Sequence, residues 1–359
     1  MKVAVITCYD QVNYVRAQAL RTAFAAAPDC SVVVVKNSQR GLLRYLEVPF
    51  KILKTKLVER PDVFVITFRG YEMLPITLLF KGRKPLIFDE FINAGEYLAE
   101  HGKLNLESPL GKLFMWWYSG LLKRCRFVLA DTQAHAEYSA KLCHLPIDTY
   151  RALPVGVAEN LFRPDAAKHV LAQDGSFTVF YYGHMVPLQG MQYILDAAVL
   201  LKDTHPEVVF SISGGKEKDR QAVAAAVEKG ARIAKYVDWT PFDKIPEAAI
   251  AADLCLGGPF GNTLQGQFVI AGKSFQFLAC AAPVVIGKNK VSNGFVDKQN
   301  CLLVPQGNAQ ALADAIAWAS IHRSKLPAIG RAGRALYDER FSMRTISSMV
   351  ETMVKDLRV

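Results

Sequence analysis

Several features that mark particular protein classes are missing from this chain of 359 residues. No run of about 18 uncharged apolar residues occurs, which argues against a membrane-spanning helix. The apolar N-terminal stretch is too short for a signal peptide. The seven cysteines are odd in number and never spaced C-x-x-C, which argues against a disulfide framework and a cysteine-based zinc site. We therefore expect a cytoplasmic protein.

Two ligand-binding motifs are also missing. The first expected strand, residues 3–7, is not followed by G-x-G-x-x-G, which argues against a Rossmann oxidoreductase. No D-x-D pair of acids stands in a loop where a metal-dependent transferase would need it. We expect neither a cofactor nor a metal.

The composition is that of a packed globular protein, with 51% hydrophobic and 21% charged residues. The length suits two domains. The net charge of +10 suggests an anionic partner, such as nucleotide phosphates or an acidic membrane face. Nucleic acid is not expected, because no DNA- or RNA-binding motif accompanies the charge.

Short apolar strands alternate with amphipathic helices along both halves of the chain, a pattern typical of parallel sheets covered on both faces. Proline, glycine and charged residues interrupt it near residues 154–165. We expect an α/β protein with two Rossmann-like, doubly wound domains facing a central cleft, over residues 1–165 and 166–340. A helix at 341–359 is expected to cross back to the first domain. The expected strands are residues 3–7, 31–35, 63–68, 85–88, 127–130 and 150–154, then 178–182, 208–213, 232–236, 254–257, 284–286 and 301–304.

Glycine-containing turns follow two expected strands of the second half. Gly183 and Gly190 flank the first turn, with His184 and Gln189 between them, and Gly214 and Gly215 follow the next strand. Glycine lets backbone N–H groups approach an anion such as a pyrophosphate. An ordinary strand-to-helix turn explains each of these turns equally well.

A further stretch carries more information. A loop with Asn262 and Thr263 leads to a helix that opens at Gly272, with Lys273 in its first turn and Gln276 one turn later. A cation at a helix N-terminus opposes the helix dipole, and a bound anion removes that conflict. Lys273 is therefore a candidate phosphate ligand, and a surface lysine is the alternative.

The order of these segments resembles the retaining GT-B glycosyltransferases of family four. It runs Gly-x-x-Val-Pro-x-x-Gly from Gly183, Gly-Gly at Gly214, Lys-x-x-Gln-x-Leu-Ala from Lys273, and Pro-Val-Val from Pro283. The likeness is good over about residues 178–345. It is looser in the first half, where residues 88–91 and 130–135 are similar to a subset of that family.

The resemblance implies a hexosyltransferase-type enzyme that uses a UDP- or GDP-sugar without metal and with retention. It places the donor diphosphate against Gly183 and His184. Gln276 stands where the family usually has a ribose-binding acid, and Phe268 where a second glutamate is common. His184 and Gln189 replace the usual arginine and lysine. Asp89, Glu90 and His135 are candidates to orient the acceptor, a glycan or lipid-linked molecule, although Asp89 could equally be a capping residue and His135 a helix-surface residue.

Two basic and apolar stretches lie in the first half. Residues 36–60 hold seven basic and two acidic residues among leucines and aromatics, and residues 112–126 join Trp116 and Trp117 to lysines and arginines. Such helices bind anionic bilayers. A peripheral position at the inner face of the plasma membrane is one interpretation. The other is that the apolar residues face their own sheet and the lysines face water.

Other functions compete with glycan or polysaccharide biosynthesis for the cell envelope. A sugar-nucleotide epimerase or hydrolase would need acids and histidines converging on the sugar, and the second-half loops offer only His184. A non-catalytic sugar-nucleotide binder is favoured by Phe268, His184 and Gln189.

Overall fold

A computed structural model describes residues 1–8, 14–39, 41–68, 70–100, 102–165, 175–291 and 294–358. Residues 9–13, which include the loop after the first strand, and the basic residue Arg40 lie outside the described residues. The described chain forms two compact units. One unit comprises Met1–Gly156 with Met343–Val359, and the other comprises Val157–Ser342.

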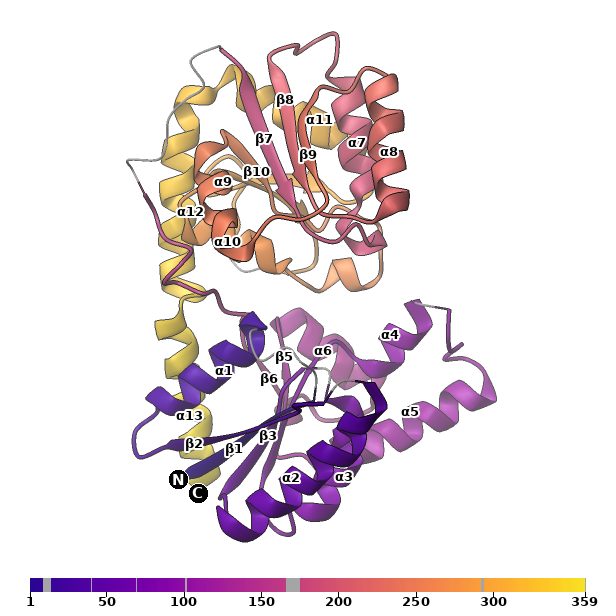
Figure 1. The fold of residues 1–359 in the computed structure, drawn as a ribbon, viewed down its shortest axis with the longest axis vertical. Helices are drawn as coiled ribbons and strands as arrows, with labels where there is room; N and C mark the ends of the chain where they lie inside the picture. Colours follow the sequence, from indigo (N-terminus) through magenta and orange to yellow (C-terminus); the bar gives the residue numbers. More distant parts are fainter. Residues whose placement is uncertain are drawn as a thin grey trace. The chain divides into compact units, whose positions relative to one another are not determined.

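The first unit is a six-stranded parallel sheet in the order β2-β1-β3-β4-β5-β6 (Figure 1). All six expected strands of this half form, with ends shifted by up to three residues. Their bounds are β1 Lys2–Thr7, β2 Ser31–Lys36, β3 Val63–Ile66, β4 Leu86–Phe91, β5 Phe127–Ala130 and β6 Tyr150–Ala152. Strands β3 and β5 are buried at every residue, as a sheet covered on both faces requires.

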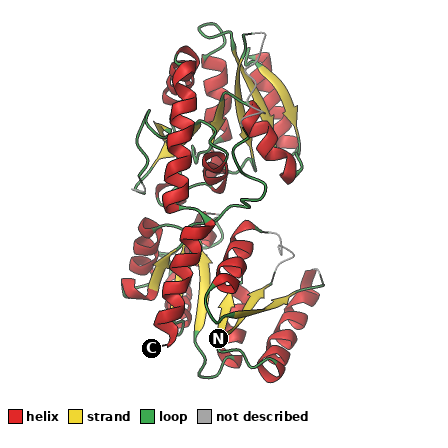
Figure 2. Ribbon diagram, turned by 90° about the vertical axis from the view of Figure 1, so that its left-hand side faces the viewer, coloured by secondary structure: helices red, strands yellow, loops and turns green. Residues whose placement is uncertain are grey.

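Helices cover both faces of this sheet (Figures 1 and 2). On one face, α1 (Val15–Ala26) and α13 (Met343–Arg358) pack side by side. The apolar residues Ile346, Val350 and Val354 of α13 are buried in the core of that face. The C-terminal helix is therefore part of the first unit. The other face packs against α2 (Arg44–Val58), α3 (Leu74–Phe80), α5 (Pro109–Leu122) and α6 (Gln133–Leu142), and α4 (Ala94–Glu100) lies beside α5.

The second unit is another six-stranded parallel sheet, in the order β12-β11-β10-β7-β8-β9. The strand order reverses between β7 and β10, as in Rossmann folds, whose ligands bind outside the carboxyl ends of the strands at this point. The strands are β7 Phe177–Tyr182, β8 Val208–Ser213, β9 Ile233–Val237, β10 Leu254–Leu256, β11 Val284–Lys288 and β12 Leu302–Pro305.

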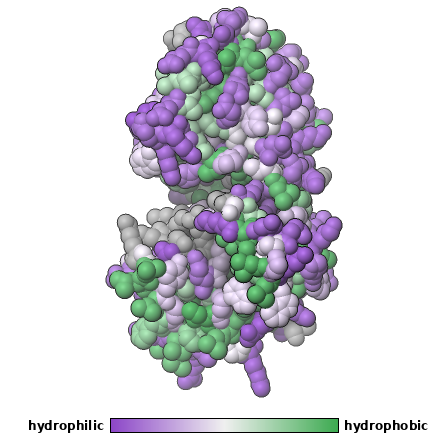
Figure 3. All heavy atoms as spheres, turned by 90° about the vertical axis from the view of Figure 1, so that its right-hand side faces the viewer, coloured by the Kyte–Doolittle hydropathy of each residue, from purple (hydrophilic) through white to green (hydrophobic). Residues whose placement is uncertain are grey.

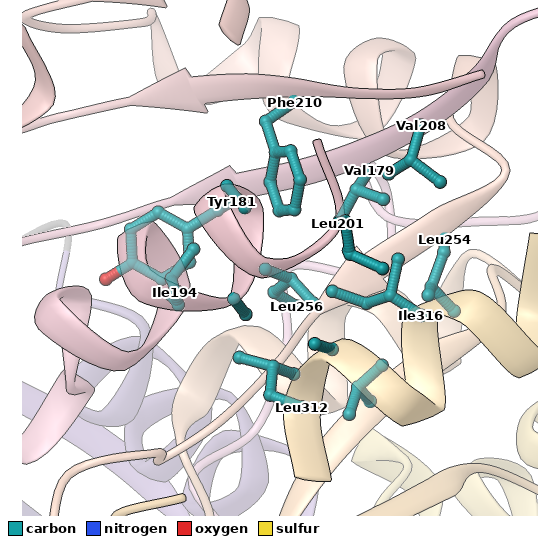
Figure 4. Packing of buried hydrophobic residues seen from close by; sticks show 14 of the residues in the cluster. Val179, Tyr181, Ile194, Leu201, Val208, Phe210, Leu254, Leu256, Leu312 and Ile316 are labelled. Atoms are coloured by element: carbon teal, nitrogen blue, oxygen red, sulfur yellow. The ribbon is translucent and has the colours of Figure 1, made fainter. Parts of the chain in front are cut away.

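Six α-helices of 7 to 15 residues belong to the described part of this unit. They are α7 Met191–Leu200, α8 Glu217–Glu228, α9 Ile245–Ala251, α10 Gly272–Ala279, α11 Ala309–Ile321 and α12 Leu326–Arg340, with the 3-10 turn Pro187–Gln189 before α7. Apolar residues of β7, β8 and β10 interlock with those of α7 and α11 to form the core (Figure 4). This core fixes the strand ends from which the loops of the site project.

The units divide earlier than the boundary expected at residue 165. Phe162 is fully buried, and its ring lies 5.2 Å from that of Phe242 in the second unit. Glu159 accepts a hydrogen bond of 2.8 Å from the Tyr337 hydroxyl of the same unit. These contacts place residues 157–165 with the second sheet.

Candidate functional site

The first two glycine turns pack backbone against backbone at the carboxyl edge of the second sheet. Gly183 follows β7 with φ of 139°, and Gly214 follows β8 with φ of 112°. A Cβ atom on Gly214 would lie 2.2 Å from the Gly183 carbonyl oxygen. Only glycine permits this approach, so both residues shape the edge of the site. Gly215 beside them packs against the Met185 side chain.

The loop after β10 packs against the first glycine turn. A Cβ atom on Gly261 would lie 1.9 Å from the carbonyl oxygen of Pro187, and one on Gly190 would lie 2.4 Å from the Gly261 nitrogen. The Gly261 N–H group donates to the Leu188 carbonyl over 3.1 Å. The loops that follow β7 and β10 thus meet at the point where the strand order reverses.

Lys273, in the first turn of α10, reaches this junction. Its side chain is buried, and its Nζ donates a hydrogen bond to Oε1 of Gln189. The same nitrogen lies 4.2 Å from the centre of the Tyr181 ring and 3.3 Å from where a Cβ atom of Gly183 would stand. The predicted convergence of Gly183 and the Lys273 helix is therefore present.

No carboxylate among the described residues forms an ion pair with Lys273. Burial alone lowers the pKa of its ammonium group from 10.5 to about 7. A buried charge without a counter-charge is costly, and proteins normally pair it or neutralise it. The arrangement is suited to an anion that enters beside Gly183 and the N-terminus of α10.

Gln276 lies one turn after Lys273 on the same helix. Its side chain is buried, and its Oε1 accepts a hydrogen bond from the Tyr182 hydroxyl. Tyr182 ends β7, so this bond ties α10 to the strand that carries the first glycine turn. The amide is fixed close to Lys273.

Three further predicted donor residues, His184, Asn262 and Thr263, are in loops and are not buried. Thr263 uses its Oγ1 to accept a hydrogen bond of 3.1 Å from the Gly266 N–H group, which closes its own turn. Asn262 and His184 are exposed. Among the described residues, no hydrogen bond joins any of these three side chains to Lys273.

The position of Asp89 differs from the one expected, which was directly after the strand at residues 85–88. It lies inside β4, not at the end of a strand, and its side chain is fully buried. Arg16 forms an ion pair with it over 2.8 Å and also donates to the carbonyl oxygens of Leu153 and Pro154. Asp89 therefore holds α1 and the segment after β6 against the sheet, and its oxygens are not open to a ligand.

Glu90, the next residue, is also buried. Its carboxylate accepts hydrogen bonds from Asn93 (2.9 Å), Tyr118 (2.8 Å) and Ser139 (2.7 Å). Burial raises the pKa of Glu90 despite these bonds. The residue joins β4 to α5 and α6.

His135 lies at the start of α6 and is buried between two carboxylates. Its Nδ1 is 2.8 Å from Oδ1 of Asp131, and its Nε2 is 3.3 Å from Oε2 of Glu96. Burial lowers the pKa of the ring, but the two acids outweigh it and raise the pKa to about 10. The imidazole is therefore protonated at neutral pH, and it is not the surface residue that the sequence left open.

Solved structures resemble the chain along its whole length. HepE of Anabaena in complex with UDP-glucose is 16% identical, with a TM-score of 0.74 over 99% of this chain and 100% of that chain. Sucrose-phosphate synthase of Thermosynechococcus elongatus is 14% identical, with a TM-score of 0.75 over 99% of each chain. The chain has the GT-B fold. A glycosyltransferase of Rickettsia africae is 12% identical, with a TM-score of 0.69 over 99% of this GT-B chain and 98% of that chain.

A family model described as "Glycosyl transferases group 1" matches residues 176–320 of the GT-B chain. The matched stretch runs from β7 into α11 and includes Gly183, Gln189, Gly214, Lys273 and Gln276. The match supports a glycosyltransferase assignment. A search of the curated proteins finds no match. None of the helices in the described ranges is long and apolar enough to cross a bilayer.

Several partners of the predicted residues lie too far along the chain to be found from the sequence. Arg16 is 73 positions from Asp89, and Glu96 is 39 positions from His135, so no local pattern pairs them. Asp131 lies only four positions before His135, just ahead of Thr132, the N-cap of α6. Tyr181 is the second-last residue of β7, the strand that leads into the first glycine turn. Nothing in the sequence shows that its ring faces Lys273 in the second unit of the GT-B fold.

Proposed function

We propose that this GT-B protein transfers a sugar from a nucleoside diphosphate sugar to a glycan or lipid-linked acceptor. The observation that carries the proposal is the buried ammonium of Lys273 beside Gly183, whose hydrogen-bond partner is the neutral amide of Gln189. A diphosphate is an anion of the right class for such a pocket, and the HepE structure contains UDP-glucose. A UDP-sugar is therefore the first donor to test.

The chemistry requires stabilisation of the negative charge that builds on the departing diphosphate. Lys273 and the N–H groups at the start of α10 can provide this stabilisation, so the proposal needs no metal ion. Binding of the anion restores the charged form of Lys273, because a nearby negative charge raises the pKa that burial lowers. We propose retention of configuration on the basis of the resemblance to family four.

A thermal-shift screen of UDP, GDP, ADP and their sugars, with a chelator present, tests the proposal. One nucleoside diphosphate should raise the unfolding midpoint by mass action, by the equivalent of about 2.7 kcal/mol at a hundred times its Kd. Lys273→Met should abolish the shift. Lys229→Met is the matched control, since Lys229 is an exposed lysine of the same unit.

The absence of any nucleotide response, or a full response in Lys273→Met, would refute the proposal. The site also contains features of a non-catalytic binder: Phe268 is buried where the family commonly has an acid, with Lys290 over its ring at 5.2 Å. A specific nucleotide shift without transfer to any glycan or lipid acceptor would support that second function.

The proposal includes a peripheral position at the cytoplasmic face of a membrane, because α2 has two apolar faces. Val48, Ile52 and Thr55 are buried against the sheet. On the remainder of the helix, Leu46 (74%) and Phe50 (68%) are exposed, as is Leu57. The alternative that these apolar residues all face their own sheet does not fit α2.

Helix α5 repeats this arrangement. Leu110, Leu113 and Trp116 are exposed, Trp116 by 73%. Exposed cations lie on and beside the two helices: Lys54, Arg60, Lys112, Lys123, Arg124 and Arg126. We call α2 and α5 with these side chains the basic apolar surface. Figure 3 shows apolar side chains gathered on the lower, first unit. Large apolar patches with cations favour an anionic bilayer.

Flotation with vesicles of phosphatidylglycerol and phosphatidylcholine tests this part. Trp116→Ser should reduce the bound fraction severalfold, and high salt should weaken binding through screening. Trp239→Ser is the matched control, because Trp239 is equally exposed, at 73%, in the second unit. Equal losses in both variants, or no binding at low salt, would contradict a membrane role for this surface.

A further inference from the structure

The first unit contains an apolar cavity that the donor site does not use. Its volume is about 340 Å³, within the range of small-molecule sites. Aromatic and aliphatic side chains from Phe68, the turn Tyr71–Met73, α4 and α5 line it, and Glu72 is the one charged residue among them. Glu72 is exposed, which places its charge at the rim.

Hydrogen bonds hold two walls of the cavity open. Tyr118 donates to the Glu90 carboxylate over 2.8 Å, and Tyr71 donates to the Ile92 carbonyl over 2.6 Å. The Phe114 ring stacks on Tyr118 with centres 5.9 Å apart. Because these rings are fixed by bonds to the carboxyl end of β4, the cavity exists before any ligand arrives. That end of a parallel sheet is where α/β domains bind ligands.

The residues that line the cavity are mostly aromatic and aliphatic, so they offer water few hydrogen-bond partners. Tyr71 and Tyr118 direct their hydroxyl groups to β4 and its following loop, and the other aromatic lining residues are Phe68, Tyr97, Phe114 and Trp117. Cavities of this kind bind hydrocarbon more readily than water. The occupant that fits is therefore an apolar chain.

The cavity also opens toward the basic apolar surface. Trp117 is a wall of the cavity and is 46% exposed on α5. Leu113 and Trp116, its neighbours on that helix, are exposed, as is Lys112, which directly precedes Leu113. A chain that leaves a bilayer under α5 meets this wall first.

We propose that this cavity binds the hydrocarbon chain of a lipid-linked acceptor. The inference rests on the proposed function, since it specifies the acceptor as an amphiphile. The chain occupies the space between α4 and α5, and the polar head group lies toward the carboxyl end of β4. The basic apolar surface attracts the anionic membrane that contains the acceptor.

Alkyl β-glucosides with chains of six, eight and ten carbons, kept below their critical micelle concentrations, are the probes. Calorimetry on the full chain should show affinity rising about fourfold for each added methylene, which corresponds to ~0.8 kcal/mol. Leu98→Phe, which adds volume inside the cavity, should weaken the decyl probe at least tenfold. Leu79→Phe makes the same exchange at a position of α3 that is 73% exposed and outside the lining, and it should leave the affinity unchanged.

Trp117→Ala provides a second variant, since its half-exposed side chain contributes less to folding than Leu98 does. It should weaken the decyl probe at least fivefold. Unchanged thermal midpoints and unchanged UDP-glucose binding show that each variant is folded. Affinity independent of chain length, or equal losses in Leu98→Phe and Leu79→Phe, would overturn the inference. Nucleotide binding that persists in that case would leave the proposed function standing, whereas probe binding without any nucleotide binding would refute the proposed function alone.

Discussion

Replacing Lys273 by methionine should stabilise the free protein while it destroys nucleotide binding. The pKa of Lys273 is lowered from 10.5 to about 7 by burial, so the unfolded chain binds a proton more tightly than the folded one between these values. Folding must therefore either remove the proton from this ammonium group or bury its charge, and both changes cost free energy. At about 1.4 kcal/mol per pKa unit, the cost is on the order of 4 kcal/mol at pH 7 and 2 kcal/mol at pH 9.

The sign of the pH dependence follows from the lowered pKa. The destabilisation is fully present below pH 7 and disappears as the pH rises toward 10.5. Urea unfolding of Lys273→Met and wild type should show an advantage for the variant that shrinks by roughly half between pH 7 and 9. The contact with the Tyr181 ring offsets part of the cost, which makes these magnitudes upper values.

The same lysine predicts proton uptake on donor binding. At pH 8 the free protein carries roughly a tenth of a proton on Lys273, and a bound diphosphate that restores the ordinary pKa demands uptake of ~0.9 proton. At pH 6 the uptake should fall to ~0.1. Titration calorimetry in buffers of different ionisation enthalpy measures the proton uptake at each pH. UDP-glucose is the preferred ligand, because UDP has a terminal phosphate that itself titrates near pH 6.

Two results would refute this reasoning. One is UDP-glucose binding with no net proton uptake at pH 8. The other is a variant at Lys273 that is less stable than wild type at pH 7 and binds the nucleotide normally. Lys229→Met should match wild type in every measurement, which controls for the loss of a positive charge from the second unit.

Three further substitutions have defined outcomes. Gln276→Ala should weaken UDP-glucose binding about fivefold to tenfold in calorimetry, since it removes a fixed amide beside the phosphate site. Gly214→Ala should cost at least ~2 kcal/mol in urea unfolding, because a Cβ atom would collide with the Gly183 carbonyl oxygen at 2.2 Å and φ is positive; an unchanged midpoint would contradict this. Arg16→Met should cost ~3–5 kcal/mol by leaving Asp89 buried and unpaired, and Arg16→Met with Asp89→Leu should recover most of that loss. A double variant no more stable than the single one would show that the ion pair is not the cause.

The strands could be predicted from the sequence because their signal is local. Each buried strand is a short apolar run between turns, and all twelve expected strands form. The opening of α10 at Gly272 was predictable in the same way, and with it the position of Lys273 one residue into the helix. Parallel pairing then brings the ends of β7 and β10 together.

The roles of the acids in the first unit could not be predicted in this way. Asp89 appeared to end a strand, but β4 continues to Phe91 and a distant arginine covers the carboxylate. His135 appeared as a helix-surface residue or a catalytic one, but it is buried, and its Nε2 contacts Glu96 from another helix. Partners separated by dozens of residues leave no periodic pattern in a single sequence.

A crystal structure of the full chain with UDP tests the central claim most directly. In that structure a diphosphate oxygen should accept a hydrogen bond from Nζ of Lys273, beside Gly183 and the first N–H groups of α10, and Gln189 should be released from the lysine. A nucleotide bound elsewhere, with Lys273 still bonded to Gln189, would contradict it.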